Sequence, residues 1–324
     1  MVEGLGKALD EAKGTLLPYS PREVLGLLIS QIRVELVTER YNVLVPTSVG
    51  GRTKFSLAPT RILDWVRTNL IPDTVTLGLD QPDMVRLLVF SMAMPYRMAS
   101  GQSLATQSEL VRRSKRRDFQ QIISDHFIGR MGEVAFKKFA FEKFGRKIAL
   151  DWKIGQDLRS FETDFVGSRR RVDIKSTDTL EGIWAVAPNG ADYGVFVKVC
   201  LPRDFFFKVL AHISSMKKLL DYARERADSS QDRSTVELVD YIEREAYDVK
   251  FQAKALVCGF FLAKDYAVTP AGTELAYLGE VEEEKYFVSR VTRLADFPPT
   301  MVRSSSLLVA TGVGHSPLRR ARGR

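Results

Sequence analysis

Cysteine and histidine are scarce in this chain, with two and three copies respectively among 324 residues. Two thiols are too few for a disulfide scaffold or a four-thiolate zinc site, so the fold is expected to depend on its hydrophobic core. Cys200 and Cys258 both lie in apolar runs typical of strands, which suits a reducing compartment. The histidines, His126, His212 and His315, leave little material for a histidine-metal centre or a Ser-His-Asp triad.

Long hydrophobic runs are also missing from the sequence. The longest uninterrupted apolar run, residues 255–263, is less than half of a membrane span. The first residues, MVEGLGKALDEAKG, lack the apolar stretch of a signal peptide, so we expect a cytoplasmic protein without a membrane anchor. The glycine pairs at 4–6 and 312–314 do not complete a phosphate-binding loop, and no nucleotide cofactor is expected.

Positive charge is in excess, and it is concentrated in two segments. The net charge is +8 and 45% of the residues are apolar, a composition typical of an ordered protein with a preference for anionic partners. Five cations fall within residues 112–117, in a stretch compatible with a helix, and residues 301–324 carry five arginines and no acid. The remainder of the chain is close to neutral, so these two segments are the expected contacts for phosphate groups.

At roughly 150 residues per domain, the length predicts two domains. We assign residues 1–118 to a mainly helical N-terminal domain and place a linker in the small, polar stretch 99–107. The patterns within this domain predict four elements: a helix over residues 21–40, a hairpin turning at Gly50-Gly51, a helix opened by Pro59, and a core helix over 81–98 that stops at Pro95.

Residues 119–300 alternate helical and strand-like patterns, which predicts an α/β (α+β) domain with a mixed sheet flanked by helices. The expected strands lie at 157–167, 169–177, 182–187, 192–200 and, after a helical insert at about 204–250, from 255 onward. Residues 301–324 are expected to form a mobile basic tail.

One of these strands carries charge where charge is expensive. In RRRVDIKST, residues 169–177, Val172 and Ile174 point to one side, and Asp173 and Lys175 point to the other. Unpaired charge on a strand that is otherwise suited to burial costs free energy. The carboxylate and the ammonium are therefore expected to pair with each other or to bind a ligand. The ordinary alternative is a solvated strand face with a surface ion pair.

A second carboxylate can reach the same strand. Asp164 lies nine residues before Asp173, and a hairpin across the intervening basic turn would bring the two side chains together. Two adjacent carboxylates repel, and a divalent cation relieves that repulsion. Oxygen ligands without a nearby histidine or cysteine favour Mg²⁺ or Mn²⁺ over zinc.

A glutamate on the preceding helix can face the same cleft. Glu133 lies at the edge of the apolar face of GRMGEVAFKKFAFEKFG, where Gly129 and Gly132 permit the close approach of another backbone or a substrate. Glu142 on the same helix, or Glu162 near the first carboxylate, could take its place.

In their order and spacing, these residues resemble the PD-(D/E)XK nuclease superfamily, which includes many restriction endonucleases and the archaeal-type Holliday junction resolvases. The matching elements are Glu133 on the first helix, Thr163-Asp164 at the first motif carboxylate, and Asp173-Ile174-Lys175 at the [D/E]-x-K position, followed by Ser176-Thr177. Thr163 replaces the namesake proline and Asp173 stands where glutamate is commoner, but neither change removes a ligand. The resemblance covers roughly residues 125–265 and implies a restriction-endonuclease-like core.

The resemblance implies metal-assisted phosphodiester hydrolysis. Mg²⁺, with Mn²⁺ as a substitute, would be held by Asp164, Asp173, the main-chain carbonyl of Ile174 and, directly or through water, Glu133. Lys175 would orient or help to deprotonate the attacking water and would stabilise the developing negative charge.

The function expected on this basis is a Mg²⁺-dependent endonuclease acting on double-stranded DNA, most similar to a type II restriction endonuclease, working as a homodimer, with residues 1–118 as a DNA-recognition domain. The alternatives are a structure-specific repair or recombination nuclease and a DNA-binding protein that keeps the fold without activity. DNA backbone contacts are expected from two groups of cations, for which a solvated charged surface is the ordinary alternative: Arg112, Arg113, Lys115, Arg116 and Arg117, and Arg169, Arg170 and Arg171.

Overall fold

The computed structural model describes most of the chain between residues 19 and 287. The described ranges are 19–78, 81–99, 111–112, 115–116, 119–152, 164–166, 170–185, 191–201, 205–212, 214–246, 252–262, 268–269, 274–275, 279–280 and 285–287. The expected linker at 100–107, Arg113, Arg117, Arg169 and the tail 301–324 lie outside these ranges.

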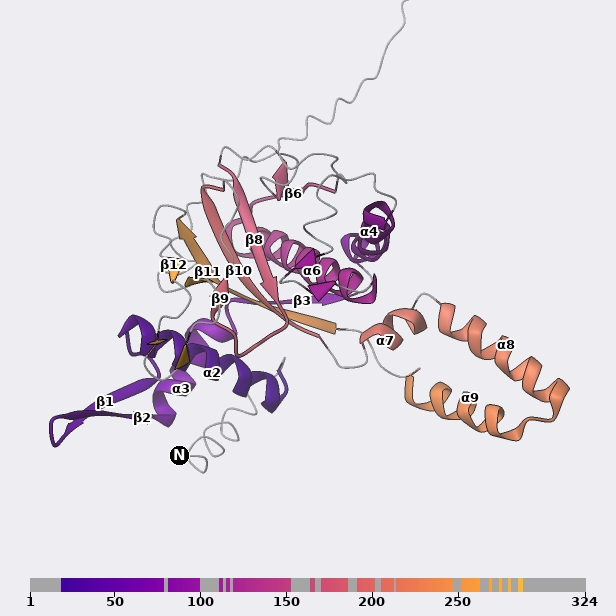
Figure 1. Ribbon diagram of the computed structural model, residues 1–324, viewed down its shortest axis with the longest axis horizontal. Helices are drawn as coiled ribbons and strands as arrows, with labels where there is room; N and C mark the ends of the chain where they lie inside the picture. The colour runs from indigo at the N-terminus through magenta and orange to yellow at the C-terminus, as the bar shows by residue number, and fades with distance from the viewer. Residues whose placement is uncertain are drawn as a thin grey trace, which may run out of the picture.

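A mixed four-stranded sheet lies at the centre of an α+β fold (Figure 1). Its strands follow the order β3 (Thr74–Gly78), β11 (Gln252–Leu262), β10 (Tyr193–Cys200) and β8 (Val172–Thr177). β8 runs parallel to β10, whereas the β10–β11 and β11–β3 pairs are antiparallel. The expected mixed sheet is therefore confirmed, and β8, the strand with the charged pair, is an edge strand of it.

One face of this sheet packs against a long helix, α6 (Phe119–Phe144), which α4 (Pro82–Ala99) covers in turn. The alternate residues of β8 and β10 that point to this face are buried with the apolar side of α6, as strand geometry requires. A Cβ atom added at Gly132 would stand 1.7 Å from Oγ of Ser176 on β8. Glycine at this position therefore lets the helix approach the strand, as the sequence predicted.

The opposite face of the sheet is covered by N-terminal elements. α2 (Pro21–Thr38), α3 (Pro59–Trp65) and the π-helical turn η1 (Val66–Leu70) form a second apolar cluster together with Cys200 and Leu256. Ser20 caps α2 in a capping box, and Pro59 opens α3 as predicted. The predicted hairpin is β1 (Leu44–Val49) and β2 (Arg52–Leu57), whose turn places both glycines at positive φ.

The helical insert is also confirmed, as three helices between β10 and β11. They are α7 (Phe205–His212), α8 (Ser215–Ser230) and α9 (Arg233–Ala246), and α8 and α9 form a hairpin that projects from the body of the protein (Figure 1). The remaining described strands are short: β4 (Val111–Arg112), β5 (Lys115–Arg116), β6 (Ala149–Leu150), β7 (Phe165–Val166), β9 (Trp184–Ala185), β12 (Val268–Thr269), β13 (Glu274–Leu275), β14 (Gly279–Glu280) and β15 (Lys285–Phe287).

Two local predictions are wrong. α4 does not stop at Pro95 but continues to residue 99, because packing against α6 offsets the hydrogen bond that proline cannot donate. The basic run is not helical: β4 and β5 pair, with Arg112 opposite Lys115. In a helix, Arg112 and Arg116 would be like charges at i,i+4, which is a destabilising spacing.

The boundary expected at residue 118 does not separate two cores. β3 forms the outer strand of the central sheet beside β11, and Val75, Leu77 and Met84 are buried with residues of α6. Because strand pairing over more than 170 residues of sequence cannot be seen in local patterns, the sequence did not reveal this connection. The methionines of α4 are also divided, since Met84 is buried and Met92 is half exposed.

Candidate functional site

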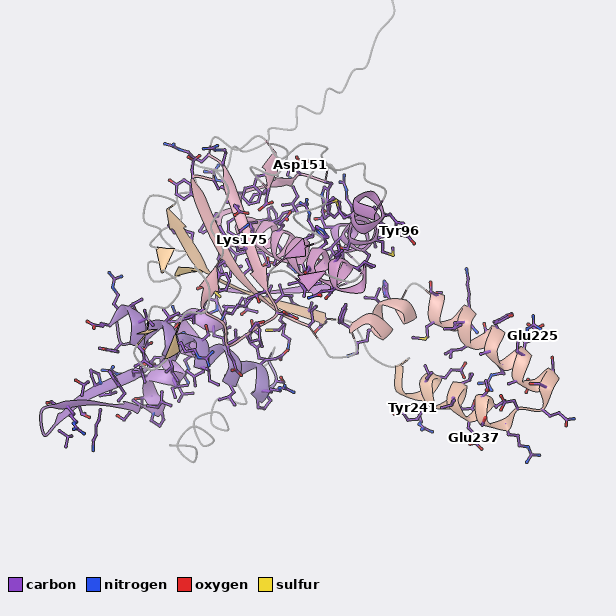
Figure 2. All side chains as sticks on the ribbon, viewed as in Figure 1. Tyr96, Asp151, Lys175, Glu225, Glu237 and Tyr241 are labelled. Atoms are coloured by element: carbon purple, nitrogen blue, oxygen red, sulfur yellow. The ribbon has the colours of Figure 1, made fainter. Side chains whose placement is uncertain are left out.

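The charged pair predicted on β8 is formed in the structure. Nζ of Lys175 lies 3.0 Å from Oδ1 and 2.9 Å from Oδ2 of Asp173, and it donates its hydrogen bond to Oδ1. Asp173 is buried, whereas about a third of the Lys175 side chain is exposed. The solvated strand face that sequence allowed as an alternative does not describe this carboxylate. Figure 2 shows Lys175 over the central sheet.

Asp164 lies along the open edge of β8, where the sequence placed it. Its main-chain N–H donates to the carbonyl of Val172 at 3.0 Å, and its Oδ2 accepts from the N–H of Ile174 at 2.6 Å. The next residue, Phe165, is buried and stacks on Phe136 of α6, which anchors the segment. The carboxylate of Asp164 is thus fixed against the strand that carries Asp173.

Glu133 approaches from α6 and is held by a partner that the sequence analysis missed. Nη1 of Arg130 lies 2.5 Å from Oε2 of Glu133 and also donates to the carbonyl of Asp151 at 2.9 Å. The Arg130 guanidinium sits 4.3 Å from the centre of the Phe90 ring. The i,i+3 spacing of Arg130 and Glu133 on a helix was the signal available in the sequence.

The three carboxylates act on one another electrostatically. Burial raises the pKa of Asp164 to about 6, with a further contribution from the charge of Asp173. Burial also raises the pKa of Glu133 well above its usual range, and the charge of Asp164 adds to this effect. Arg130 lowers both pKa values, and Lys175 lowers that of Asp164. When all three carboxylates are ionised, the site holds more negative charge than its two cations offset, and a divalent cation relieves that repulsion.

The residues present fit a hard divalent cation in part. Oδ2 of Asp173 is buried and accepts no well-aligned hydrogen bond, although the ammonium of Lys175 lies 2.9 Å away, so one of its lone pairs can serve a ligand. The N–H and carbonyl of a strand residue point the same way, so the Ile174 carbonyl faces the edge where its N–H meets Asp164. Within the described residues, however, no three His, Cys, Asp or Glu side chains are grouped so that they could hold a metal ion by themselves. Two carboxylates and one main-chain carbonyl are the ligand set available.

The cations expected to contact DNA are only partly described. Arg170 and Arg171 are exposed where the chain enters β8, and the main-chain N–H of Arg171 donates to Oδ2 of Asp192 at 2.9 Å. The main chain of Arg112, Lys115 and Arg116 lies in the β4–β5 hairpin.

The two glutamates considered in place of Glu133 find no support in the described residues. Glu142 is about half exposed and lies 3.8 Å from Nζ of Lys138, as an ordinary surface ion pair on α6. Glu162 lies outside the described residues.

Comparison with known proteins identifies no relative. No protein-family model, curated protein or solved structure matches this chain. In the part of the chain that the structure describes, no helix is both long and apolar enough to span a bilayer.

Proposed function

We propose that this protein is a Mg²⁺- or Mn²⁺-dependent nuclease that hydrolyses phosphodiester bonds of double-stranded DNA. The observation that carries the proposal is the buried carboxylate of Asp173, which pairs with Lys175 and raises the pKa of a second fixed carboxylate, Asp164. The charges of Asp173 and Asp164 repel each other in a buried setting, so a divalent cation is expected as their ligand. The resemblance of the motif order and spacing to the PD-(D/E)XK nucleases supports the same proposal.

Each charged residue has a role that follows from its contacts. Asp164, Asp173 and the Ile174 carbonyl would hold the cation, which supplies Lewis-acid stabilisation of charge on the phosphate when bound. Lys175 presents an ammonium beside Asp173 with part of its side chain exposed, so it can donate to a phosphate oxygen or position a water. Arg130 holds Glu133 in place and lowers its pKa, which opposes the larger effect of burial.

Within this class we propose a restriction-type endonuclease ahead of a repair or recombination nuclease. The helical elements of residues 21–70 pack on Cys200 and Leu256, on the sheet face to which Asp173 and Lys175 point, and they could contact DNA beside the cut. The exposed Arg170 and Arg171 flank the same strand and could neutralise neighbouring phosphates. A fold that binds DNA without cutting it is the alternative that the experiment must separate.

The experiment is incubation of purified protein with plasmid, linear duplex and four-way-junction DNA, in Mg²⁺, in Mn²⁺ and in chelator. We expect metal-dependent cleavage of plasmid into discrete fragments and none in chelator. Preferential cutting of the junction would instead identify a recombination nuclease. DNA binding without cleavage of any substrate in either metal would refute the enzyme proposal.

A further inference from the structure

A cavity of about 370 Å³ lies on the same side of the sheet as the candidate site. It is enclosed by α2, by the α3–η1 segment and by strands β10 and β11. In the parallel register of β8 and β10, Lys175 pairs with Phe196, and Lys198 follows two residues later. The Cα atoms of Lys175 and Lys198 are therefore roughly 8 Å apart on one face of the sheet.

Lys198 forms part of the cavity wall as a buried cation without an anion. Its side chain is 2% exposed, and its ammonium donates to Oγ of Ser30 and to the carbonyl of Leu180, both neutral acceptors. It forms no ion pair with any described residue, and burial lowers its pKa to about 8. An ammonium has three N–H donors, so one remains for a group inside the cavity. An anionic ligand would offset the cost of burying this charge.

The other walls suit a flat molecule with polar edges. Trp65 and Tyr41 contribute aromatic surface, and Asn42 and Asn69 contribute amides. Arg40 and Asn42 are exposed, which places the open end of the cavity beside them.

Two carboxylates also line the cavity, Glu35 and Asp73. The oxygens of Glu35 accept hydrogen bonds from the main-chain N–H groups of Val43 and Leu44 and from the amide of Gln31. Glu35 therefore stabilises the start of β1, and its lone pairs are already engaged by protein donors.

We propose that this cavity binds a small aromatic phosphate of the size of a mononucleotide, with its phosphate on Lys198 and its ring against Trp65 and Tyr41. The volume falls in the range of small-molecule sites, about 300–1,000 Å³. Amide side chains recognise base edges and aromatic rings stack on bases, so the remaining walls match the same ligand. The inference does not depend on cleavage at Asp173.

Isothermal titration calorimetry of the full chain in chelator tests this proposal, with the four deoxynucleoside 5′-monophosphates, deoxyadenosine and inorganic phosphate as probes. We expect at least one monophosphate to bind with a submillimolar dissociation constant and Lys198→Met to weaken it at least tenfold. Lys254→Met is the matched control, because Lys254 is a largely buried lysine on the neighbouring strand that already pairs with Glu23 at 2.8 Å. Lys254→Met is expected to bind the monophosphate as tightly as the wild type does.

Several results would overturn the assignment. The cavity would not be a nucleotide site if the wild type bound none of the monophosphates. The ammonium would have no role in binding if Lys198→Met bound the monophosphate as tightly as the wild type, or if deoxyadenosine bound as tightly as the monophosphate. If inorganic phosphate bound as tightly as the nucleotides, the aromatic side chains of the cavity would contribute nothing to binding. Removing the unpaired charge of Lys198 is expected to preserve the fold, whereas Lys254→Met leaves Glu23 without its partner and is expected to lower the melting temperature, which is measured for each variant.

A second, independent feature is a repeated motif in the α8–α9 hairpin. Residues 219–222 read LLDY and residues 238–241 read LVDY, one in each helix. The second aliphatic residue of each, Leu220 and Val239, is buried between the helices. The first aliphatic residue and the tyrosine are exposed in both copies: Leu219 59%, Tyr222 55%, Leu238 62% and Tyr241 55%.

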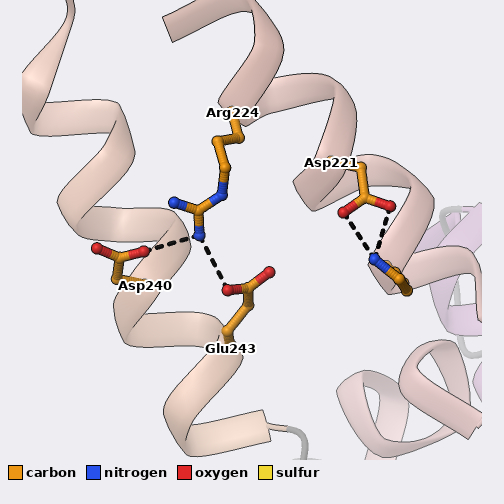
Figure 3. A network of polar contacts seen from close by, with 5 residues as sticks. Asp221, Arg224, Asp240 and Glu243 are labelled. Atoms are coloured by element: carbon orange, nitrogen blue, oxygen red, sulfur yellow. Dashed lines mark hydrogen bonds and ion pairs between the residues drawn. The ribbon is translucent and has the colours of Figure 1, made fainter. Parts of the chain in front are cut away.

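The two exposed pairs lie on one face of the hairpin. In each helix, viewed from its N-terminus, the exposed leucine and tyrosine lie on the same side of the buried residue. The two antiparallel helices are related by an approximate two-fold axis normal to the plane of the hairpin, which keeps equivalent residues on one face. The opposite face is polar, since Arg224 donates to Asp240 at 2.7 Å and to Glu243 at 2.9 Å (Figure 3). The guanidinium groups of Arg226 and Arg244 lie 5.2 Å and 5.6 Å from the ring centres of Tyr222 and Tyr241, so the first face combines exposed apolar side chains with two arginines, whereas the opposite face carries ion pairs.

We infer that the apolar face, Leu219, Tyr222, Leu238 and Tyr241, is the contact between two copies of this chain. An isologous contact pairs the same patch on both copies, and four exposed apolar and aromatic side chains on one face can pack against the same four of a second copy. Four side chains of this size, each more than half exposed, offer on the order of 400 Å² per copy. A symmetric pair would bury on the order of 800 Å² through them, so flanking side chains must complete the ~1,200 Å² of a stable interface, and a micromolar dimer is expected.

Sedimentation equilibrium of the full chain over micromolar concentrations tests this contact. The wild type is expected to form dimers, and Leu219→Lys/Leu238→Lys to weaken them at least tenfold. Glu225→Lys, an exposed site on α8 outside this face, is the control and is expected to dimerise as the wild type does. A monomeric wild type, or a dimer unaffected by the double substitution, would overturn the assignment, and circular dichroism confirms that the hairpin stays helical.

Discussion

Replacing Asp164 by asparagine is expected to make the metal-free protein more stable while destroying its proposed activity. Burial and the charge of Asp173 raise the pKa of this carboxyl group from 3.8 to about 6. The unfolded chain therefore releases the proton near pH 4, whereas the folded chain keeps it until near pH 6. Stability of the wild type falls as the pH rises through this interval, because the folded state binds more protons than the unfolded state.

The size of the effect follows from the same shift. At pH 8 a shift of this size corresponds to about 3 kcal/mol of lost unfolding free energy, and contacts that asparagine cannot reproduce reduce the expected gain to about 1–3 kcal/mol. Asparagine keeps an oxygen that can accept from the N–H of Ile174, so the strand contact is preserved. The extra stability of Asp164→Asn is expected to increase between pH 4 and pH 6 and to remain constant above pH 6.

Urea unfolding in chelator at pH 4, 6 and 8 measures this difference directly. Asp228→Asn, on the exposed side of α8, is the control and is expected to change stability little at any of these pH values. Added Mg²⁺ or Mn²⁺ is expected to stabilise the wild type and not Asp164→Asn. A variant that is less stable than the wild type at pH 8 would show that Asp164 is a structural residue whose charge the fold already satisfies.

Two further predictions concern the packing of the site and the charged tail. Gly132→Ala is expected to lower the unfolding free energy by about 1–3 kcal/mol or more, because its Cβ would meet Ser176; Gly129→Ala, which meets nothing within 4 Å, is expected to raise it by up to about 1 kcal/mol. Chemical denaturation compares the two, and equal effects would contradict the close helix–strand approach. Deleting residues 301–324, which carry five arginines, is expected to reduce the salt dependence of non-specific DNA binding while sparing cleavage. Fluorescence anisotropy at several salt concentrations measures this, and an unchanged slope would show that the tail does not contact phosphates.

The parts of the site that sequence could predict are those set by local geometry. Strand alternation places Asp173 and Lys175 on one face, and a tight crossing explains a glycine at 132. Helix and strand periods also located α2, the β1–β2 hairpin and the helical insert.

What sequence could not predict depends on contacts between distant segments. β3 joins the sheet through pairing with β11, and no local pattern encodes that partner. α4 passes through Pro95 because tertiary packing outweighs the local cost of proline. Lys198 looked like an ordinary polar residue in a strand, and only the helix packed over it makes it a buried cation.

The measurement that tests the central claim most directly is plasmid cleavage by the wild type and by Asp173→Ala in Mg²⁺, with DNA binding measured in parallel. The buried carboxylate of Asp173 is expected to be indispensable for holding the cation, so the variant should lose cleavage and retain binding. Cleavage by Asp173→Ala at the wild-type rate would contradict the assignment of this site.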